Sequence, residues 1–240
     1  MRTVVVTGAS SGIGLACARA FLSRGDAVVA QYRSAAEPVE VLRNEFGASK
    51  VVPVQADLGS EAGCVQVLAG AETVSVLVHA AGIWKEAPIG SVSREALEEM
   101  FRVNTLSAYY LARETVTRMP AGCMVFVGST AGQRGEPRHS HYAGSKAALW
   151  GLVQSLAQEL APRIRVNLVS PGWVRTSMAE SALAQPGRYE RIVGGIPLQR
   201  VADVEDVVSA VMFLADEKQR HLTGVDLPVS GGALLPMPRG

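Results

Sequence analysis

The chain has 240 residues, of which 48% are hydrophobic and 19% charged, a length and composition that suit one large α/β domain. The net charge of +1, without any run of like charges, argues against nucleic acid or an anionic membrane surface as a partner. Three widely spaced cysteines without a Cys-x-x-Cys pair argue against a disulfide framework and favour a reducing, cytoplasmic location. A strand pattern follows Met1 directly and no apolar stretch is long enough to span a bilayer, so we expect neither a signal peptide nor a membrane segment.

The first element is a short apolar strand at 4–6, followed by a glycine-rich turn and a helical pattern that reaches Gly25. In this context, backbone N–H groups and the positive end of a helix bind a pyrophosphate. The glycine spacing differs from both Gly-x-Gly-x-x-Gly and the Walker P-loop. The turn predicts dinucleotide binding by Gly8, Ser10, Ser11, Gly12, Ile13 and Gly14.

The second strand, at 28–30, leads to Tyr32, Arg33 and Ser34, and no carboxylate stands among them. In dinucleotide folds an acidic residue here binds the ribose hydroxyls of NAD, whereas an arginine accommodates the 2′-phosphate of NADP. These residues therefore favour NADP, although a surface arginine after a strand is also common in other proteins.

The third strand is expected at 51–55, after a helix at 39–46. Asp57 and Leu58 follow it directly, before a helix at 61–68. Asp57 is therefore either a contact for an adenine ring or the cap of that helix.

The fourth strand, at 74–78, runs into His79. The next residues, Ala80, Ala81 and Gly82, are small and would let a cofactor lie against the backbone. His79 fits a hydrogen-bonded core position as well as a functional one.

A long helix is expected from Ser93 to Met119, with Asn104 on its apolar stripe. A buried amide needs hydrogen-bond partners, so Asn104 is either a structural tie or holds a water in a proton path. The fifth strand, at 124–127, places Ser129 at its exit.

A loop rich in glycine and proline leads from Ser129 to a helix that starts near Tyr142 and ends near Leu160. Tyr142 and Lys146 are four residues apart and therefore lie on one helix face. An ammonium group beside a phenol favours the phenolate. Together with a nearby serine hydroxyl, this pair can move a proton to or from a carbonyl oxygen.

The last third of the chain continues the alternation with a strand at 165–169, a helix at 204–214 and a strand at 225–229. The turn at 170–176 follows a strand and would face the ligand crevice. We expect the irregular segment 175–198 to be a lid over the substrate, with a disordered loop as the alternative. The apolar tail at 234–240 is expected to contact another subunit.

No linker or repeat interrupts this order, which predicts one α/β domain over residues 1–240. The fold expected is a Rossmann-type doubly wound parallel sheet of about seven strands, with helices on both faces.

These motifs, taken together and in this order, resemble the short-chain dehydrogenase/reductase family over nearly the whole chain. The turn at 7–14 resembles its cofactor motif, and the family's Asn-Asn-Ala-Gly appears here with His79 and Ala80 in place of the two asparagines. We expect this departure to change packing without abolishing cofactor binding. The resemblance assigns a catalytic tetrad of Asn104, Ser129, Tyr142 and Lys146. It adds Asp57 to the cofactor contacts, together with Pro171, Gly172, Val174 and Thr176 beside the nicotinamide.

The resemblance also implies the mechanism. Tyr142 is the acid/base at the substrate oxygen, Ser129 binds that oxygen, and Lys146 binds the nicotinamide ribose and promotes ionisation of Tyr142. Asn104 holds a water that continues the proton relay. Hydride moves between the nicotinamide and the carbonyl carbon.

The NADP preference and the run at 32–34 resemble 3-oxoacyl-[acyl-carrier-protein] reductases of fatty acid biosynthesis, so we expect reduction of a 3-oxoacyl thioester. A carrier protein could then dock on arginines near the active-site mouth: Arg134, Arg138, Arg163 and Arg165. The alternatives are a reductase of a free ketone, such as a polyketide intermediate, steroid or sugar, and a non-catalytic dinucleotide sensor. Family analogy suggests a homotetramer, and two histidines two residues apart in a loop, without a third ligand, argue against a metal site.

Overall fold

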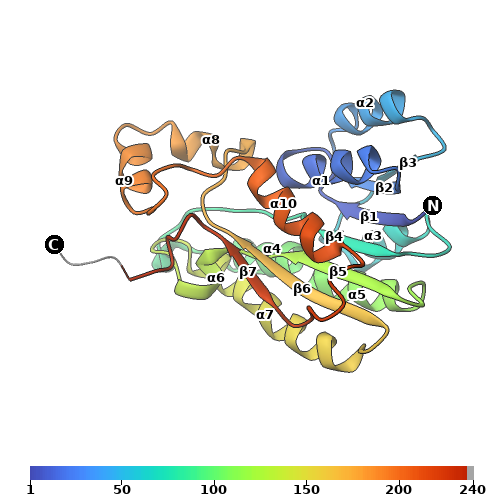
Figure 1. Cartoon of the computed structure of the whole chain (residues 1–240). Helices are drawn as coiled ribbons and strands as arrows, with labels where there is room; N and C mark the ends of the chain where they lie inside the picture. Colours follow the sequence, from blue (N-terminus) through green and yellow to red (C-terminus); the bar gives the residue numbers. More distant parts are fainter. Residues whose placement is uncertain (237–240) are drawn as a thin grey trace.

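The computed structural model describes residues 1–236, which form a parallel sheet of seven strands in the order β3-β2-β1-β4-β5-β6-β7 (Figure 1). The strands are β1 (Thr3–Thr7), β2 (Ala27–Tyr32), β3 (Val51–Gln55), β4 (Val76–His79), β5 (Gly122–Val127), β6 (Ile164–Pro171) and β7 (Asp226–Val229). The expected doubly wound Rossmann-type fold is confirmed. The strand order reverses between β1 and β4, and ligands of such sheets bind at this reversal, beside the carboxyl ends of the strands.

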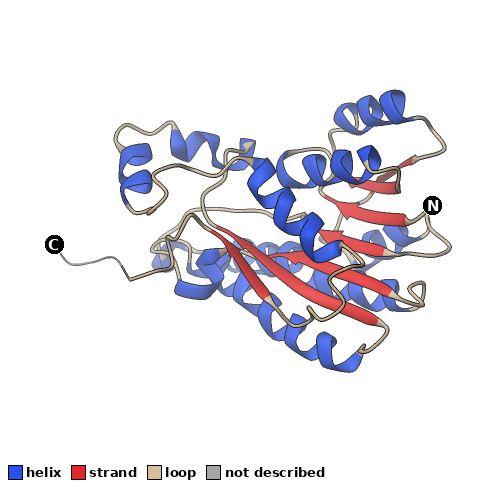
Figure 2. Ribbon diagram, viewed as in Figure 1, coloured by secondary structure: helices blue, strands red, loops and turns tan. Residues whose placement is uncertain are grey.

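Helices cover both faces of the sheet, and each face has its own apolar core (Figure 2). One face is covered by α1 (Gly12–Ser23), α2 (Glu37–Phe46) and α10 (Val204–Ala215). The other face is covered by α3 (Glu61–Leu68), α5 (Ser107–Val116) and α7 (Ser140–Glu159). Val5 points to one core, whereas its neighbours Val4 and Val6 point to the other. Burial on both sides explains why the central strands are continuous runs of valine and other apolar residues.

The single helix expected from Ser93 to Met119 is divided into three parts. Helix α4 (Arg94–Phe101) and helix α5 are separated by one turn of π-helix, η2 (Arg102–Leu106), which contains Asn104. The break comes where the buried Asn104 bonds to another segment, and π-turns of this kind often occur at functional sites. The apolar periodicity continues across the turn, so the sequence pattern alone does not reveal it.

Two segments expected to be irregular contain helices. The loop before Tyr142 includes the short helix α6 (Thr130–Arg134), and the segment 175–198 includes α8 (Ser177–Leu183) and α9 (Arg188–Gly194). The disordered alternative for 175–198 is therefore wrong. Both helices project beyond the sheet on the side where α6 lies (Figure 1).

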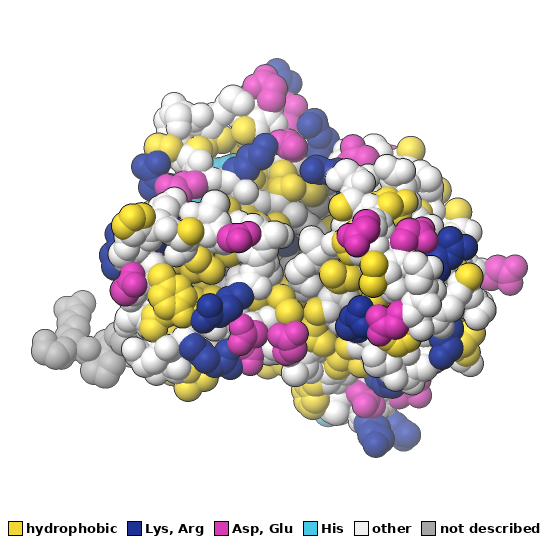
Figure 3. Space-filling view, turned by 90° about the horizontal axis from the view of Figure 1, so that it is seen from above, with side chains coloured by type: hydrophobic (Ala, Val, Ile, Leu, Met, Phe, Trp, Pro, Cys, Tyr) yellow, Lys and Arg dark blue, Asp and Glu magenta, His cyan; other side chains and the backbone are white. Residues whose placement is uncertain are grey.

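The remaining short element of the described chain is the 3-10 turn η1 (Ile89–Ser91). Of the tail expected to contact another subunit, Leu235 is exposed, while 237–240 lie outside the described residues. Within residues 1–236, no helix combines the length and apolar composition that crossing a membrane requires. Seen from above, the molecule is hollowed near its centre, and charged side chains of both signs rim the hollow (Figure 3).

Candidate active site

The glycine-rich turn connects β1 to α1 and fits the phosphates of a dinucleotide. A Cβ atom on Gly14 would lie 2.2 Å from the backbone oxygen of Gly8, so the helix approaches the turn at a distance that only glycine permits. Ser11 is the N-cap of α1, its hydroxyl makes no capping bond, and the first turn of α1 has no acidic residue. The positive end of a 12-residue helix therefore remains available to an anion.

A buried glutamine supports this turn, and the sequence analysis missed its role. Gln31, at the end of β2, accepts a hydrogen bond from the Gly8 N–H at 2.8 Å. Its amide group donates to the Ala56 carbonyl at 2.7 Å. Gln31 thereby fixes the glycine turn to the carboxyl end of β3, and a single glutamine in an apolar strand was the available signal.

The residues expected to bind the adenosine half of the cofactor lie at the ends of β2 and β3. Arg33 is exposed and makes no ion pair within residues 1–236. Asp57 accepts a hydrogen bond from the Gly59 N–H at 2.9 Å, whereas Ser60 caps α3. The alternative role of Asp57 as the helix cap is therefore wrong, while its carboxylate remains exposed. Tyr32 and Ser34 flank Arg33, and Leu58 is buried beside Asp57.

His79 is a hydrogen-bonded core residue. Burial lowers the pKa of His79 to about 3, with a smaller effect from Lys146, so the ring is neutral. The ring nitrogens lie 2.8 Å from the Thr7 hydroxyl and 3.1 Å from the Ser107 hydroxyl. The Ser107 hydroxyl donates its proton to the Val103 carbonyl, so its oxygen accepts a hydrogen bond from the ring, and we assign the ring proton to Nε2. Nδ1 then carries no proton and accepts a hydrogen bond from the Thr7 hydroxyl.

This chain of hydrogen bonds continues to the segment after β4. Thr7 accepts a hydrogen bond from the Ala81 N–H at 3.2 Å, so His79 connects β1, the small residues after β4 and the start of α5. At the position where the family has its first asparagine, this chain therefore has a hydrogen-bonded core residue, while retained cofactor binding stays a prediction.

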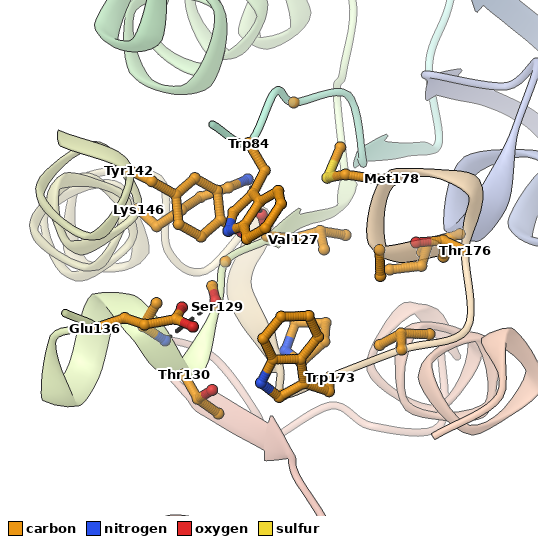
Figure 4. A pocket seen from close by; sticks show the side chains of 18 of the residues that line it. Trp84, Val127, Ser129, Thr130, Glu136, Tyr142, Lys146, Trp173, Thr176 and Met178 are labelled. Atoms are coloured by element: carbon orange, nitrogen blue, oxygen red, sulfur yellow. Dashed lines mark hydrogen bonds between the residues drawn. The ribbon is translucent and has the colours of Figure 1, made fainter. Parts of the chain in front are cut away.

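Most of the residues expected around the nicotinamide line one cleft beside the carboxyl ends of β4, β5 and β6 (Figure 4). Tyr142 and Lys146 enter it from α7, and Ser129 enters it from the end of β5. The other expected residues in its lining are Ile13, Ala80, Gly82, Pro171, Gly172, Val174 and Thr176. Segments distant in the sequence therefore meet as the motifs predict.

Ser129 is the N-cap of α6. Its hydroxyl oxygen accepts a hydrogen bond from the Ala131 N–H at 3.1 Å. Because this bond uses a lone pair of the oxygen, the hydroxyl proton is free to be donated into the cleft.

Burial affects the two titratable groups of the cleft in opposite directions. It raises the pKa of Tyr142 to about 12, an effect that the Ser129 hydroxyl opposes and the Glu136 carboxylate increases. It lowers the pKa of Lys146 to about 8, and the ammonium donates to the Val127 carbonyl at 2.8 Å. Lys146 is not among the groups that shift the pKa of Tyr142, so the expected promotion of Tyr142 ionisation by Lys146 stays a prediction.

Asn104 lies behind the cleft and is completely buried. Its side chain pairs with the backbone of Ile83, accepting from the N–H at 2.8 Å and donating to the carbonyl at 2.9 Å. It also donates to the Ser145 hydroxyl at 3.0 Å. The amide is thus a structural tie that holds a cleft-lining segment to the π-helix, while the water-relay role stays a prediction.

The cleft also contains residues that the sequence analysis did not assign. Trp84 stacks on His139 with ring centroids 4.7 Å apart and meets Trp173 edge-on at 6.1 Å. Glu136 borders the same cavity on the side of Ser129 (Figure 4). Of these residues, only Trp173 belongs to a segment expected to face the crevice, the turn at 170–176. Nothing in the local sequence marks Trp84 or Glu136, because both lie in loops without periodicity.

The four arginines suggested as a docking surface do not form one. Arg165 lies at the start of β6, at the amino ends of the strands and thus at the opposite end of the sheet from the cleft. It donates to three backbone carbonyls. Arg163 lies beside it, bonded to the Pro120 carbonyl. Only Arg134 and Arg138 lie near the cleft, and Arg138 pairs with Glu86. Within residues 1–236, no three His, Cys, Asp or Glu side chains gather as a metal site would require.

Known proteins match nearly the whole chain. A family model described as "Enoyl-(Acyl carrier protein) reductase" matches residues 8–233. L-xylulose reductase of Homo sapiens is 36% identical over 236 residues, which cover 96% of each chain. A 3-oxoacyl-[acyl-carrier-protein] reductase of Rickettsia bellii is 32% identical and covers 98% of this chain and 97% of its own.

A solved structure described as a putative NAD(P)-dependent gluconate 5-dehydrogenase from Beutenbergia cavernae, with NADP at low occupancy, superimposes with a TM-score of 0.92. It is 36% identical, and the match covers 98% of this chain and 97% of that one. The fold, the cleft and these likenesses define an NAD(P)-dependent oxidoreductase that acts on CH–OH and C=O groups. The chain belongs to the short-chain dehydrogenase/reductase family.

Proposed function

We propose that this enzyme reduces the carbonyl of a free, polyhydroxylated ketone, such as a ketose, with NADPH. The observation that carries the proposal is the Glu136 carboxylate, which borders the cleft on the side of Ser129 and raises the pKa of Tyr142 (Figure 4). A carboxylate at this place accepts hydrogen bonds from hydroxyl groups next to the reacting carbonyl. An apolar acyl chain would leave the carboxylate desolvated and unpaired, which is costly.

The comparisons favour the same substrate class over the 3-oxoacyl thioester. The likeness to L-xylulose reductase, at 36% identity, exceeds that to the 3-oxoacyl-[acyl-carrier-protein] reductase, at 32%. Two of the four arginines suggested for carrier docking, Arg163 and Arg165, also lie at the amino ends of the strands, away from the cleft. The indole rings of Trp84 and Trp173 offer apolar surfaces to the carbon skeleton, and Glu136 supplies the polar selection.

In this proposal, Tyr142 donates its proton to the carbonyl oxygen as hydride reaches the carbonyl carbon. A bound nicotinamide supplies that hydride. At pH 7 a tyrosine with a pKa of about 12 is protonated and ready to act as the acid. The Ser129 hydroxyl, whose oxygen already accepts the Ala131 N–H, donates to the same carbonyl oxygen and orients it.

The cofactor would lie from the glycine turn to the cleft. The N-terminus of α1 would hold its phosphates, and Lys146 would bind its nicotinamide ribose. Asn104 positions Ile83 in the cleft wall and is proposed to continue the proton path through a water. Arg33, exposed at the end of β2, would pair with a 2′-phosphate, which supports NADP.

We also propose that residues 175–198 form a lid. Met178 and Ala179 of α8 line the catalytic cleft. Arg188 and Arg191 of α9 line a second cavity, which shares Glu136 and Trp173 with the first. A segment that borders both cavities from outside the sheet is placed to exclude water from them.

The substrate is tested by NADPH oxidation with L-xylulose, D-erythrulose, 2-pentanone and an acetoacetyl thioester. We expect the ketoses to be reduced most efficiently. Glu136→Gln is expected to lower kcat/KM for the ketoses by about tenfold or more, with little effect on 2-pentanone, which has no hydroxyl groups. A higher kcat/KM for the thioester than for every ketose would refute the proposal.

The catalytic assignment is tested with Tyr142→Phe, which keeps the ring and removes the proton donor. We expect kcat to fall by about 10²–10⁴-fold. NADPH affinity, measured by cofactor fluorescence, is expected to stay within about twofold. Activity within tenfold of wild type would show that another group donates the proton.

The cofactor preference is tested with Arg33→Ala. We expect KM for NADPH to rise by about tenfold, because a charge-assisted contact to the 2′-phosphate is lost, while KM for NADH is unchanged. Equal or better wild-type rates with NADH would contradict the assignment of Arg33.

A further inference from the structure

We propose that Glu86 is a positioning residue that holds the lid closed, acting through Arg188 on the wall of the substrate cavity. This inference rests on the proposed function of the cleft, and it identifies the contact that holds the lid (175–198) over the cleft. Glu86 follows β4, Arg138 precedes α7, and Arg188 begins α9, so the three charges come from three separate segments. One carboxylate between two guanidinium groups joins these segments.

The contacts are short and use both oxygens of the carboxylate. Arg138 Nε donates to Glu86 Oε1 at 2.5 Å, and Arg188 Nη1 donates to Glu86 Oε2 at 3.1 Å. Hydrogen bonding to Arg138 and then to Arg188 lowers the pKa of Glu86, so the carboxylate is ionised at neutral pH. Only 17% of the Arg188 side chain is exposed, so this pair is better shielded from water and salt than a typical surface pair.

Glu86 is held firmly on the side opposite the lid. The Ala87 N–H donates to the Arg138 carbonyl at 2.8 Å, so the two loops share a backbone bond as well as the ion pair. Arg138 has a φ of 66°, a left-handed conformation that is unfavourable for arginine. A residue held in that conformation indicates that its surroundings fix the loop.

Arg188 transmits this restraint to the cavity. Its guanidinium lies over the Trp173 ring, 5.6 Å from the centroid, in the geometry of a cation–π contact. Trp173 in turn meets Trp84 edge-on in the substrate cleft. Glu86 therefore fixes the position of an indole ring that faces the substrate, although its own contacts are with the two arginines.

The Glu86–Arg188 pair is also the lid's main polar attachment across the cleft. Within the described part of the chain, no other hydrogen bond or ion pair joins residues 177–195 to a segment outside 175–198. The other side-chain hydrogen bonds of these helices, such as Arg188 with Gln185 and Tyr189 with Arg175, are internal to the lid. Loss of the Glu86 contact should therefore shift the lid toward open states.

The first test compares Glu86→Gln with Glu190→Gln, a matched change at an exposed glutamate of α9. We expect Glu86→Gln to raise KM for the ketone about tenfold, because fewer molecules hold the closed state, with kcat and NADPH affinity within about twofold. Glu190→Gln should change none of these. A fall in kcat at constant KM in Glu86→Gln would overturn the proposal.

A mutant cycle then tests whether Glu86 acts through Arg188. We expect Arg188→Gln to reproduce the effect of Glu86→Gln, and the double variant to be no worse than either single variant. Additive losses in the double variant would overturn the proposal.

Two measurements are independent of the substrate, so they test the Glu86–Arg188 attachment even if no ketone in the panel is reduced. In a Trp150→Phe background, which removes an exposed indole on α7, Glu86→Gln should red-shift the emission of the remaining tryptophans. It should also speed chymotryptic cleavage at Tyr189 several-fold. Unchanged emission and cleavage in Glu86→Gln would refute the Glu86–Arg188 attachment and would leave the proposed function unaffected.

Discussion

At the scale of single residues, the site is governed by desolvation. Tyr142 and Lys146 lie on one helix face as their spacing predicts, yet burial shifts the pKa of each toward its neutral form. The same burial keeps His79 neutral and lets it serve as a hydrogen-bonded core residue. Tyr142 is therefore protonated at neutral pH, as its proposed role of proton donor in the reduction requires.

The lysine shift predicts a pH dependence of stability in the absence of cofactor. With a pKa of about 8 in the folded protein and 10.5 as the ordinary value, Lys146 loses its proton earlier in the folded state. The unfolded state then binds more protons between these values, so the free energy of unfolding rises with pH, by up to about 3 kcal/mol. Denaturant titrations from pH 7.5 to 10.5 should show this gain in wild type relative to Lys146→Met.

The control for this experiment is Lys218→Met, at an exposed lysine. Its free energy of unfolding should parallel that of wild type across the same pH range. Parallel profiles for Lys146→Met and wild type would show that Lys146 is not desolvated as the structure indicates.

At the scale of elements, the site depends on how closely α6 approaches α7. A Cβ atom on Gly132 would lie 2.8 Å from the Ala147 nitrogen and 2.9 Å from the Lys146 carbonyl carbon, which belong to the α7 backbone. Ser129 caps α6, whereas Tyr142 and Lys146 belong to α7. The close approach therefore sets the distance between the serine and the tyrosine.

We expect Gly132→Ala to lower the free energy of unfolding by about 1–3 kcal/mol, because the backbone of α7 cannot yield to the new methyl group. It should also lower kcat, since α6 would carry Ser129 away from Tyr142. The comparison is Gly151→Ala on the exposed side of α7, where an added Cβ meets nothing within 4 Å.

Gly151→Ala should raise the free energy of unfolding by about 0.5–1 kcal/mol through helix propensity and leave kcat unchanged. Chemical denaturation and steady-state kinetics of both variants measure these effects. Equal behaviour of the two alanine variants would contradict the assigned role of Gly132.

At the scale of the whole molecule, two apolar cores on opposite faces of the sheet enclose all three thiols. Cys17 and Cys123 belong to one core, and Cys64 belongs to the other. Burial raises the pKa of Cys17 and Cys64 to about 12 and that of Cys123 to about 11. Thiols in this state are inert until the core opens.

We therefore expect Ellman's reagent to modify no thiol in the native protein and all three in guanidinium chloride. Because the three thiols sit in both cores, their reaction rates at intermediate denaturant should follow global unfolding. A Ser49→Cys variant, with its new thiol at an exposed position, should react within minutes. Rapid modification of a wild-type thiol under native conditions would show that one core opens separately.

The sequence by itself determined the features that short-range patterns encode. Runs of valine predict buried strands, the glycine spacing predicts the phosphate turn, and the four-residue step predicts that Tyr142 and Lys146 share a helix face. Each of these depends on residues that are neighbours in the chain, where backbone geometry fixes their relation. The fold class follows from the alternation of such elements, whereas the meeting of Ser129 with Tyr142 was implied by the family resemblance.

Only the tertiary structure decided which distant residues line the cleft and whether the pKa of each titratable group is raised or lowered. Glu136 and Trp84 come from aperiodic loops, and the Glu86–Arg188 pair joins residues 102 positions apart. The π-turn likewise lies where the Asn104 amide pairs with Ile83, 21 residues earlier. Contacts and desolvation between remote segments have no local signature, because they exist only once the sheet has brought those segments together.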